Sequence, residues 1–212
     1  MIDKTQRKNI WISSLVIIGL LVIDQISKIV VKTNMFLGEE IEIFSWFKIL
    51  FVENNGMAFG MELGSKLFLT LFRIVAIIFI GYYIFKLIKN NNNIKKGYIV
   101  SLSLIFAGAL GNIIDCMFYG VIFNAPLYPE VASMFPAEGG YAGLMYGRVV
   151  DMLYFPLFSF VWPEWVPFIG GNYFEFFEPV FNIADSAICI GIALILLFYR
   201  KSLPFDKSKK EE

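Results

Sequence analysis

The sequence contains no histidine and only two cysteines, and charged residues occupy just 17% of its 212 positions. The absence of histidine excludes a Ser-His-Asp triad, and two cysteines alone are too few ligands for a structural zinc site. Cys116 and Cys189 both fall within long apolar runs, where buried free thiols are the expected state. The chain also lacks a basic patch with interleaved aromatic residues, so we expect no nucleic-acid partner.

Apolar residues are abundant instead, at 58% of the chain, which is more than a water-soluble domain needs. A helix needs about 20 mainly apolar residues to cross a bilayer. Four stretches meet this requirement, at about residues 11–31, 67–88, 97–119 and 178–199. We therefore predict a mainly α integral membrane protein with four transmembrane helices, forming a single membrane domain over residues 1–212.

The net charge is zero, but the basic residues are unevenly distributed. Twelve of the 18 Lys and Arg residues lie in residues 1–10, 86–96 and 200–212. Acidic residues outnumber basic ones in the other two connections, 32–66 and 120–177. Because positive charge favours the cytoplasmic side, this asymmetry predicts that both termini are cytoplasmic and that the other two connections face outward.

The two outer connections differ in their patterns. Residues 40–44 and 47–53 alternate or run apolar and are followed by an Asn-Asn-Gly turn, which predicts a small β-sheet within 32–66. Residues 120–147 are rich in glycine and proline and indicate an irregular loop. Residues 153–177 carry many aromatic side chains and three prolines, which favours a segment at the outer membrane interface over a further span.

Polar residues recur inside the predicted spans, where they are costly and usually functional. They are Asp24, Lys28, Asn112, Asp115, Asn182 and Asp185. At 1.5 Å per residue, Asp24, Asn112 and Asp185 each lie about 10–12 Å from the outer end of their helix. Asp24 and Lys28 are four residues apart, and Asn112 with Asp115 and Asn182 with Asp185 are three apart, so each pair lies on one helix face. Three helices therefore contribute polar groups to one layer near the outer surface, which Asp151 can reach from outside.

Paired carboxylates are the chemistry that suits this layer best. Ser27 and Lys28 are adjacent on a helix and point apart, so a Ser-Lys dyad fits poorly. Two close carboxyl groups cannot both ionise easily, so one keeps a proton while the other activates water. The residues alone leave three candidates for the pair, namely Asp115, Asp151 and Asp185.

Five short motifs then occur in order along the chain. They are D-x-x-x-K, N-x-G-x-A-F, G-A-x-G-N-x-x-D, V-x-D and F-N-x-A-D-S, at residues 24–28, 54–59, 108–115, 149–151 and 181–186. With these motifs in this order, on four predicted spans with both termini inside, the chain resembles bacterial lipoprotein signal peptidase (signal peptidase II). The resemblance implies an aspartyl endopeptidase of the bacterial cytoplasmic (inner) membrane. Such an enzyme removes the signal peptide from diacylglyceryl-modified prolipoproteins, cutting before the lipidated cysteine.

The resemblance also implies roles for individual residues. Asp151 and Asp185 would form the catalytic dyad, which removes Asp115 from the pair. Supporting or substrate-binding roles would fall on the matched residues Asp24, Lys28, Asn54, Gly56, Asn112, Asp115 and Asn182. No metal or organic cofactor is implied. The partners expected are the prolipoprotein substrate and membrane lipid, and we expect a monomer.

The chain departs from the family pattern at Cys116, where the family usually carries arginine directly after the aspartate. We hypothesise that Arg148, just ahead of the V-x-D motif, supplies the missing charge. The outer segments flanking Asp151 are also longer than in most members, and we expect the extra loop to cover the substrate groove. Arg73 is isolated in the second span, and the sequence does not decide between a channel-lining role and an ion pair.

Other interpretations remain open beside these. Asp24 with Lys28 could be a structural intramembrane pair, Asn112 and Asn182 could be interhelical hydrogen-bond partners, and Asp115 is expected to be structural. A small proton-coupled transporter or channel is the rival function, because intramembrane carboxylates can relay protons. Four spans without an inverted repeat fit a transporter poorly. A non-catalytic membrane assembly factor is the third alternative.

Overall fold

The computed structural model describes residues 3–55, 66–90 and 93–203, and helix α1 (Lys4–Asn34) is its first element. A capping box closes the start of α1. The Asp3 carboxylate accepts a hydrogen bond from the Gln6 backbone N–H at 2.7 Å, and the Gln6 side chain accepts one from the Asp3 N–H at 3.0 Å. With this cap in place the helix begins several residues before the apolar run that predicted it.

Helices α2 (Lys66–Asn90) and α3 (Lys96–Ile114) correspond to the second and third predicted runs. The end of α3 passes through one π-helical turn, η2 (Asp115–Tyr119), into the short helix α4 (Gly120–Ile122). Among the described residues, three helical runs can cross a membrane by length and composition, namely α1, α2 and the continuous run from α3 to α4. The prediction of several membrane-spanning helices is therefore confirmed for these three.

Helix α5 (Ile183–Phe198) begins five residues later than the fourth predicted run, 178–199. The reason lies in the residues before it, because Pro179 interrupts a helix and Asn182 takes an extended conformation as the N-cap. Its 16 residues give a length of about 24 Å, less than the roughly 30 Å of a hydrocarbon core. A complete fourth span thus stays a prediction.

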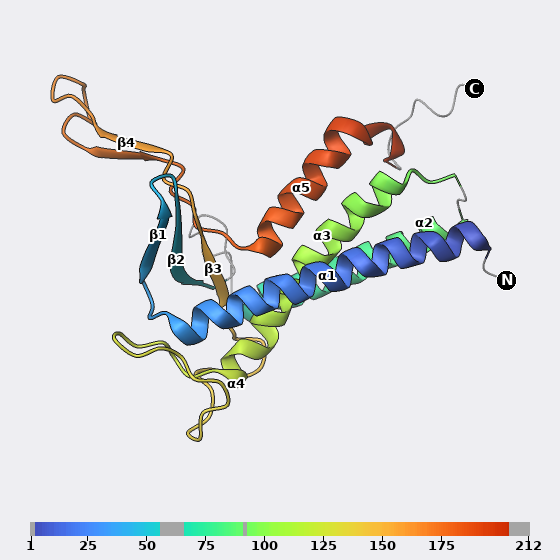
Figure 1. Cartoon of the computed structure of the whole chain (residues 1–212), viewed down its shortest axis with the longest axis horizontal. Helices are drawn as coiled ribbons and strands as arrows, with labels where there is room; N and C mark the ends of the chain where they lie inside the picture. The colour runs from blue at the N-terminus through green and yellow to red at the C-terminus, as the bar shows by residue number, and fades with distance from the viewer. Residues whose placement is uncertain (1–2, 56–65, 91–92, 204–212) are drawn as a thin grey trace.

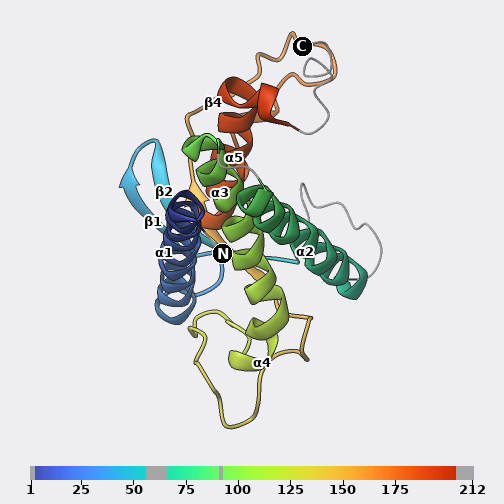
Figure 2. The same cartoon turned by 90° about the vertical axis from the view of Figure 1, so that its right-hand side faces the viewer.

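Helix α3 is the centre of the bundle, and Figure 2 shows α1, α2 and α5 arranged around it. Glycines let its neighbours approach closely. A Cβ added at Gly108 would lie 2.3 Å from the Ala184 carbonyl oxygen on α5, and one at Gly111 would lie 2.6 Å from Asp24 Oδ2 on α1. Side chains from α1, α3 and α5 therefore meet at the level of these glycines.

A three-stranded antiparallel sheet lies at the end of the bundle away from the start of α1 (Figure 1), in the order β1-β2-β3. Strands β1 (Glu40–Phe44) and β2 (Phe47–Asn54) confirm the sheet predicted within residues 32–66. Strand β3 (Val149–Tyr154) is added by a segment about 100 residues away along the chain, and it places Asp151 opposite Val52 of β2.

The two faces of β2 and β3 have different surroundings. One face packs on the C-terminal end of α1 in a buried apolar cluster. The cluster includes Val31, Met35, Phe51, Val150 and Met152. Because side chains alternate along a strand, Asp151 between Val150 and Met152 points to the opposite face. That face looks toward the helices that carry the polar layer.

The irregular loop predicted at 120–147 begins later in the structure, because the helical run continues through α4, and it covers residues 124–147. Backbone hydrogen bonds tie it to its surroundings. The Ala132 N–H donates to the Lys32 carbonyl at 3.3 Å, and the Gly147 N–H donates to the Cys116 carbonyl at 2.8 Å. The segment is thus fastened to α1 and η2, and its expected role as a cover for the substrate groove stays a prediction.

The aromatic region that follows is a β-hairpin of β4 (Phe158–Val161) and β5 (Tyr173–Phe176). It extends away from the helices beyond the three-stranded sheet (Figure 1). Trp165 and Phe168 in its connecting loop are almost wholly exposed, at 81% and 103%. Here the structure adds regular pairing to a segment predicted only as an interfacial aromatic stretch.

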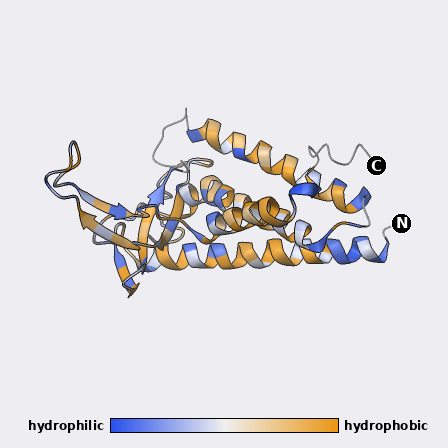
Figure 3. Ribbon diagram, turned by 90° about the horizontal axis from the view of Figure 1, so that it is seen from above, coloured by the Kyte–Doolittle hydropathy of each residue, from blue (hydrophilic) through white to orange (hydrophobic). Residues whose placement is uncertain are grey.

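The outer surface of the helices is apolar. Figure 3 shows hydrophobic residues along the length of the helices and hydrophilic ones at the N-terminal end of α1. Large side chains such as Leu15, Ile18, Phe72 and Phe79 are more than 60% exposed. Such a surface would be unfavourable in water and suits contact with lipid tails. The structure is that of a mainly helical, multi-pass membrane protein with small antiparallel sheets.

Candidate active site

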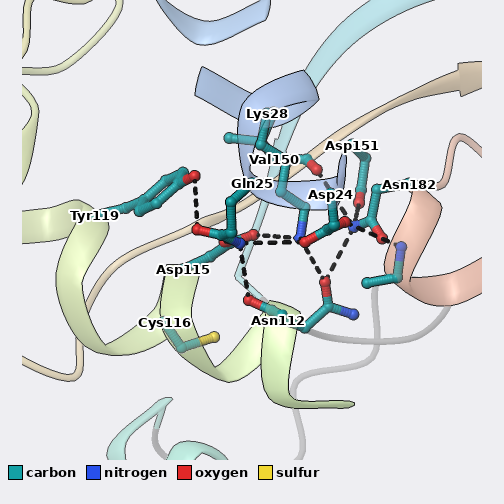
Figure 4. Close-up of polar contacts among 12 residues, drawn as sticks. Asp24, Gln25, Lys28, Asn112, Asp115, Cys116, Tyr119, Val150, Asp151 and Asn182 are labelled. Atoms are coloured by element: carbon teal, nitrogen blue, oxygen red, sulfur yellow. Dashed lines mark hydrogen bonds and ion pairs between the residues drawn. The ribbon is translucent and has the colours of Figure 1, made fainter. Parts of the chain in front are cut away.

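Lys28 of α1 is the cation of the buried polar layer. Its ammonium lies 2.9 Å from Asp24 Oδ2 and 2.7 Å from Asp115 Oδ2, and it donates a hydrogen bond to Asn112 Oδ1 at 2.9 Å. All three ionised side chains are buried. The predicted Asp24–Lys28 pair is present, and Asp115 completes it as a second carboxylate partner (Figure 4).

Asp24 also ties α1 to the start of α5. Its Oδ1 accepts a hydrogen bond from the Ala184 backbone N–H at 3.0 Å. That N–H belongs to the first turn of α5 and has no partner within its own helix. A carboxylate at this position suits the positive end of the helix dipole. Asp24 therefore fixes the depth at which α5 begins.

Two asparagines connect this cluster to the candidate catalytic carboxylates. Asn112 Nδ2 donates to Asp185 Oδ1 at 2.8 Å. Asn182 Nδ2 donates to Asp151 Oδ1 at 2.8 Å and to Asn112 Oδ1 at 3.1 Å. Each aspartate is thereby held by an amide, and the two amides contact each other. The interhelical hydrogen bonds expected of these asparagines are present, and they end on Asp151 and Asp185.

The local fold explains how Asn182 and Asp185 reach this position. Asn182 is the N-cap of α5, and its Oδ1 accepts from the Asp185 backbone N–H at 2.9 Å. Asp185 occupies the third helical position and its Oδ2 accepts from the Asn182 backbone N–H at 3.4 Å. This capping box holds the Asp185 carboxylate at a helix N-terminus. Asp185 therefore lies in the first turn of α5 and not a third of the way along a longer helix.

Asp151 lies on β3, on the face of the sheet that looks toward the helices. Its side chain is 4% exposed. Besides Asn182, Asn54 at the end of β2 donates to Asp151 Oδ2 at 3.3 Å. Two amide donors thus hold one carboxylate oxygen each, and the side chain has a defined orientation.

The electrostatic setting favours a proton on Asp151. Burial is the main cause, and the neighbouring Asp185 carboxylate is the second, of a rise in the pKa of Asp151 from 3.8 to about 7. The hydrogen bonds from Asn54 and Asn182 and the positive charge of Lys28 act in the opposite direction. Near neutral pH Asp151 can therefore carry a proton.

Such a pair can perform general acid–base chemistry. The ionised member can accept a proton from water while the protonated member hydrogen-bonds a carbonyl oxygen. Within residues 3–55, 66–90 and 93–203 there is no group of three or more Cys, Asp and Glu arranged to hold a metal ion.

The remaining predicted residues are placed differently. Gly56 lies outside the described residues. Arg148 Nη1 contacts Glu53 Oε2 at 3.1 Å, on the face of the sheet opposite Asp151. The guanidinium beside Cys116 comes instead from Arg73 of α2, whose Nη1 donates to Cys116 Sγ at 3.6 Å. Arg73 thus places a positive charge beside Cys116, while the role hypothesised for Arg148 stays a prediction.

Several polar residues of the site carried no individual prediction. Gln25 donates to Asp115 Oδ1 at 2.9 Å and to Asp24 Oδ2 at 3.1 Å, and it accepts from the Tyr119 hydroxyl at 3.2 Å (Figure 4). Lys32 is fully buried one helical turn beyond Lys28. The i,i+4 spacing that linked Asp24 to Lys28 continues to Lys32 and is the sequence signal that could have found it.

Known proteins resemble the chain along most of its length. The family described as signal peptidase (SPase) II matches residues 16–200. A lipoprotein signal peptidase of Porphyromonas gingivalis is 54% identical over 187 residues, which is 88% of this chain and 82% of that protein. A lipoprotein signal peptidase of Amoebophilus asiaticus is 40% identical over 211 residues, covering 96% of this chain and 84% of that protein.

Solved structures agree with this assignment. A bacterial membrane enzyme determined by the in meso method at 2.3 Å superimposes with a TM-score of 0.60 at 28% identity, covering 94% of this chain and 92% of the other. A second, at 1.9 Å, gives a TM-score of 0.57 at 27% identity. None of these likenesses supports the transporter alternative. The chain belongs to the signal peptidase II family, the lipoprotein signal peptidases, which are aspartic peptidases that remove signal peptides from prolipoproteins.

Proposed function

We propose that Asp151 and Asp185 are the catalytic pair with which this enzyme cleaves diacylglyceryl-modified prolipoproteins before the lipidated cysteine. The observation that carries the proposal is the amide bridge between them. Asn182 holds Asp151 and caps the helix of Asp185, while Asn112 holds Asp185 and contacts Asn182. Two carboxyl groups from distant parts of the chain are thereby oriented by one connected network.

The reaction needs one proton shared by the pair. The ionised carboxylate takes a proton from water as the water oxygen attacks the scissile carbonyl carbon. The protonated carboxyl gives its proton to the carbonyl oxygen, forming a tetrahedral diol. As the diol collapses, one of its hydroxyl groups returns a proton to the carboxylate that had protonated the carbonyl oxygen. The C–N bond breaks at the same time, and the proton taken from water passes from the other carboxyl to the leaving amine. The pair returns to its starting state with one proton, so no metal or organic cofactor is required.

The supporting residues act on position and charge. Lys28 offsets part of the negative charge of Asp24 and Asp115, close to the buried Asp151 and the partly buried Asp185. Asp24 sets the start of α5 and therefore the depth of Asp185. Asn54 orients Asp151. In this assignment Asp115 is structural, while Gly56 keeps the substrate-binding role proposed from its motif.

The proposed placement is in the bacterial cytoplasmic (inner) membrane with both termini inside. Helix α5 and the chain leading into it would complete a fourth crossing. The site would then lie about 15 Å from the outer end of α1, which is ten residues beyond Asp24. The signal helix of a prolipoprotein would enter sideways from the bilayer, and the enzyme would act as a monomer.

The aromatic hairpin β4–β5 would rest on the outer leaflet. Its exposed side chains are mainly aromatic, and they include Phe158, Trp165, Phe168 and Tyr173. Such side chains favour the boundary between lipid and water. The hairpin follows β3 directly, so this contact would hold the strand of Asp151 near the membrane surface.

A cleavage assay with a lipidated prolipoprotein in detergent tests the catalytic assignment. Replacing either Asp151 or Asp185 by Asn keeps the size and shape of the side chain but removes the acid. We expect turnover to fall by on the order of 10⁴-fold in each variant. Asp3→Asn is the matched control, because Asn also serves as an N-cap and Asp3 lies at the opposite end of α1. Substantial turnover in either dyad variant would contradict the assignment.

A further inference from the structure

A second buried charged cluster lies behind the catalytic strands, formed by Lys32, Glu53 and Arg148. The Lys32 ammonium forms an ion pair with Glu53 Oε1, and the two side chains are 0% and 1% exposed. Arg148 Nη1 lies 3.1 Å from Glu53 Oε2, with its own side chain 43% exposed. Glu53 is therefore held between two cations that come from different parts of the chain, α1 and the residue just before β3.

Aromatic rings enclose the two cations. The Lys32 ammonium lies 5.9, 5.3 and 5.1 Å from the ring centres of Phe51, Phe123 and Tyr141. The Arg148 guanidinium lies 5.4 Å from the Tyr141 ring, and the Arg148 backbone N–H donates to the Tyr141 hydroxyl at 2.6 Å. These distances suit attraction between cations and ring faces. The cluster thus fastens α1, β2, the start of β3 and the 124–147 segment to one another.

This cluster and the catalytic residues occupy opposite faces of the same two strands. In the β2–β3 pairing Glu53 lies opposite Val150, and Val52 lies opposite Asp151. Side chains alternate along each strand, so Glu53 faces the buried cluster while Asn54 shares the face of Asp151. A shift of β2 relative to β3 would move Asn54 away from Asp151.

We propose that Glu53 is a positioning residue for Asp151, acting through the strand pairing that its two ion pairs hold in place. Lys32 anchors Glu53 to the end of α1, and Arg148, the residue just before β3, anchors it to the start of that strand. With both anchors made, the Asn54 amide lies within hydrogen-bond distance of Asp151 Oδ2. The same proposal gives Arg148 a role through Glu53, the carboxylate that it contacts.

The protonation of Asp151 provides a readout that a purely structural role would not move. The charged and polar groups facing Asp151 are Asp185 on α5, Lys28 on α1, Asn54 on β2 and Asn182 at the start of α5. The hydrogen bond from Asn54 lowers the pKa of Asp151 against the effect of burial. Losing that bond would raise the pKa further, so the pH profile of cleavage would move toward higher pH.

The test compares Glu53→Gln with Glu40→Gln in the full-length enzyme. Glu40 forms an exposed ion pair with Lys48 at 2.7 Å, so the same substitution there removes an ion pair far from the cluster. For Glu53→Gln we expect kcat to fall between about 10- and 100-fold, with KM changed little and the pH profile moved upward. For Glu40→Gln we expect wild-type kinetics at every pH.

A further variant covers the case in which Glu53→Gln does not fold. Arg148→Gln removes only the partly exposed anchor and should give a smaller loss of kcat with the same upward movement of the pH profile. The proposal is overturned if a folded variant of either kind shows lower thermal stability but an unchanged pH profile. It is equally overturned if kcat stays at the wild-type value.

The inference rests on the proposed catalytic role of Asp151, and the two can fail separately. Turnover by Asp151→Asn would contradict the catalytic assignment whatever Glu53 does. An inactive Asp151→Asn together with an unchanged profile in Glu53→Gln would contradict only the positioning role.

Discussion

Asn182 shows at the scale of a single residue how one side chain can organise a site. Its side-chain Oδ1 caps α5, and its side-chain Nδ2 donates to Asp151, to Asn112 and to the Val150 backbone carbonyl. An aspartate here would keep the cap but lose the donor, since an ionised carboxylate only accepts hydrogen bonds. An alanine would lose both. Only an amide both begins the helix and holds the carboxylate of the neighbouring strand.

The raised pKa of Asp151 should also make the stability of the enzyme depend on pH. In the folded enzyme its pKa is about 7, against 3.8 ordinarily, so the folded state keeps the proton over a range where the unfolded chain has lost it. Stability from this group is therefore complete below about pH 4 and declines as pH rises through 7. Asp151→Asn has no such penalty. The melting temperature of the variant should therefore rise relative to that of the wild type as the pH increases from 4 to 8.

Thermal unfolding of both proteins in detergent across this range makes the comparison. Asp3→Asn serves again as the control and should follow the wild-type curve. Parallel curves for wild type and Asp151→Asn would contradict the raised pKa of Asp151.

At the scale of elements, α5 depends on close contact with α3. The run from Ile183 to Phe198 is short for a membrane span, and its first turn lies inside the protein against Asp24. Gly108 makes this possible, because the α5 backbone passes where a side chain would otherwise stand. Small residues at helix contacts are a general means of close packing in membranes.

Gly108→Ala should therefore destabilise the enzyme. Its new Cβ would lie 2.3 Å from the Ala184 carbonyl oxygen, which is backbone and cannot rotate away. We expect a loss of about 1–3 kcal/mol, measured by thermal or denaturant unfolding, and reduced cleavage because Asp185 moves with α5.

Gly19→Ala on α1 is the matched control, since nothing lies within 4 Å of its added Cβ. It should leave stability unchanged or raise it by up to about 1 kcal/mol through higher helix propensity. Equal effects of the two substitutions would contradict the close packing of α3 and α5.

At the scale of the whole molecule, the two ends of the helical bundle differ. The chain end near Lys4 and the α2–α3 connection lie at one end, and both sheets lie at the other (Figure 1). The basic residues concentrate at the first end. The positive-inside rule therefore predicts that the sheets and the 124–147 segment lie outside.

Cysteine labelling tests this orientation with a reagent that cannot cross membranes. Lys95 and Glu138 are both exposed and lie at opposite ends. Glu138→Cys should be labelled in intact cells, and Lys95→Cys only after the cells are lysed. The native cysteines, Cys116 and Cys189, are measured in the unmodified enzyme as background. The reverse pattern would contradict the proposed topology.

Much of the architecture follows from the sequence because its causes are local. Apolar length predicted four long helices, and among the described residues the structure shows three of them long enough to span a membrane. Depth along each helix predicted a shared polar layer containing Asp24 and Asn112, which the structure also shows. The alternation in residues 40–53 predicted β1 and β2. Helical rise, side-chain periodicity and strand alternation depend on neighbouring residues, so they can be read without knowing the fold.

Only the tertiary structure decided which distant residues meet. The pairing of β2 with β3, the burial of α5 against α3, and the partners of Arg148 and Arg73 all join segments far apart in sequence. Residue spacing sets the depth of a side chain but not its partner across a helix or sheet interface. Hence the sequence by itself determined that carboxylates and amides share a layer in the membrane, while packing determined that Asn182 and Asn112 join Asp151 to Asp185.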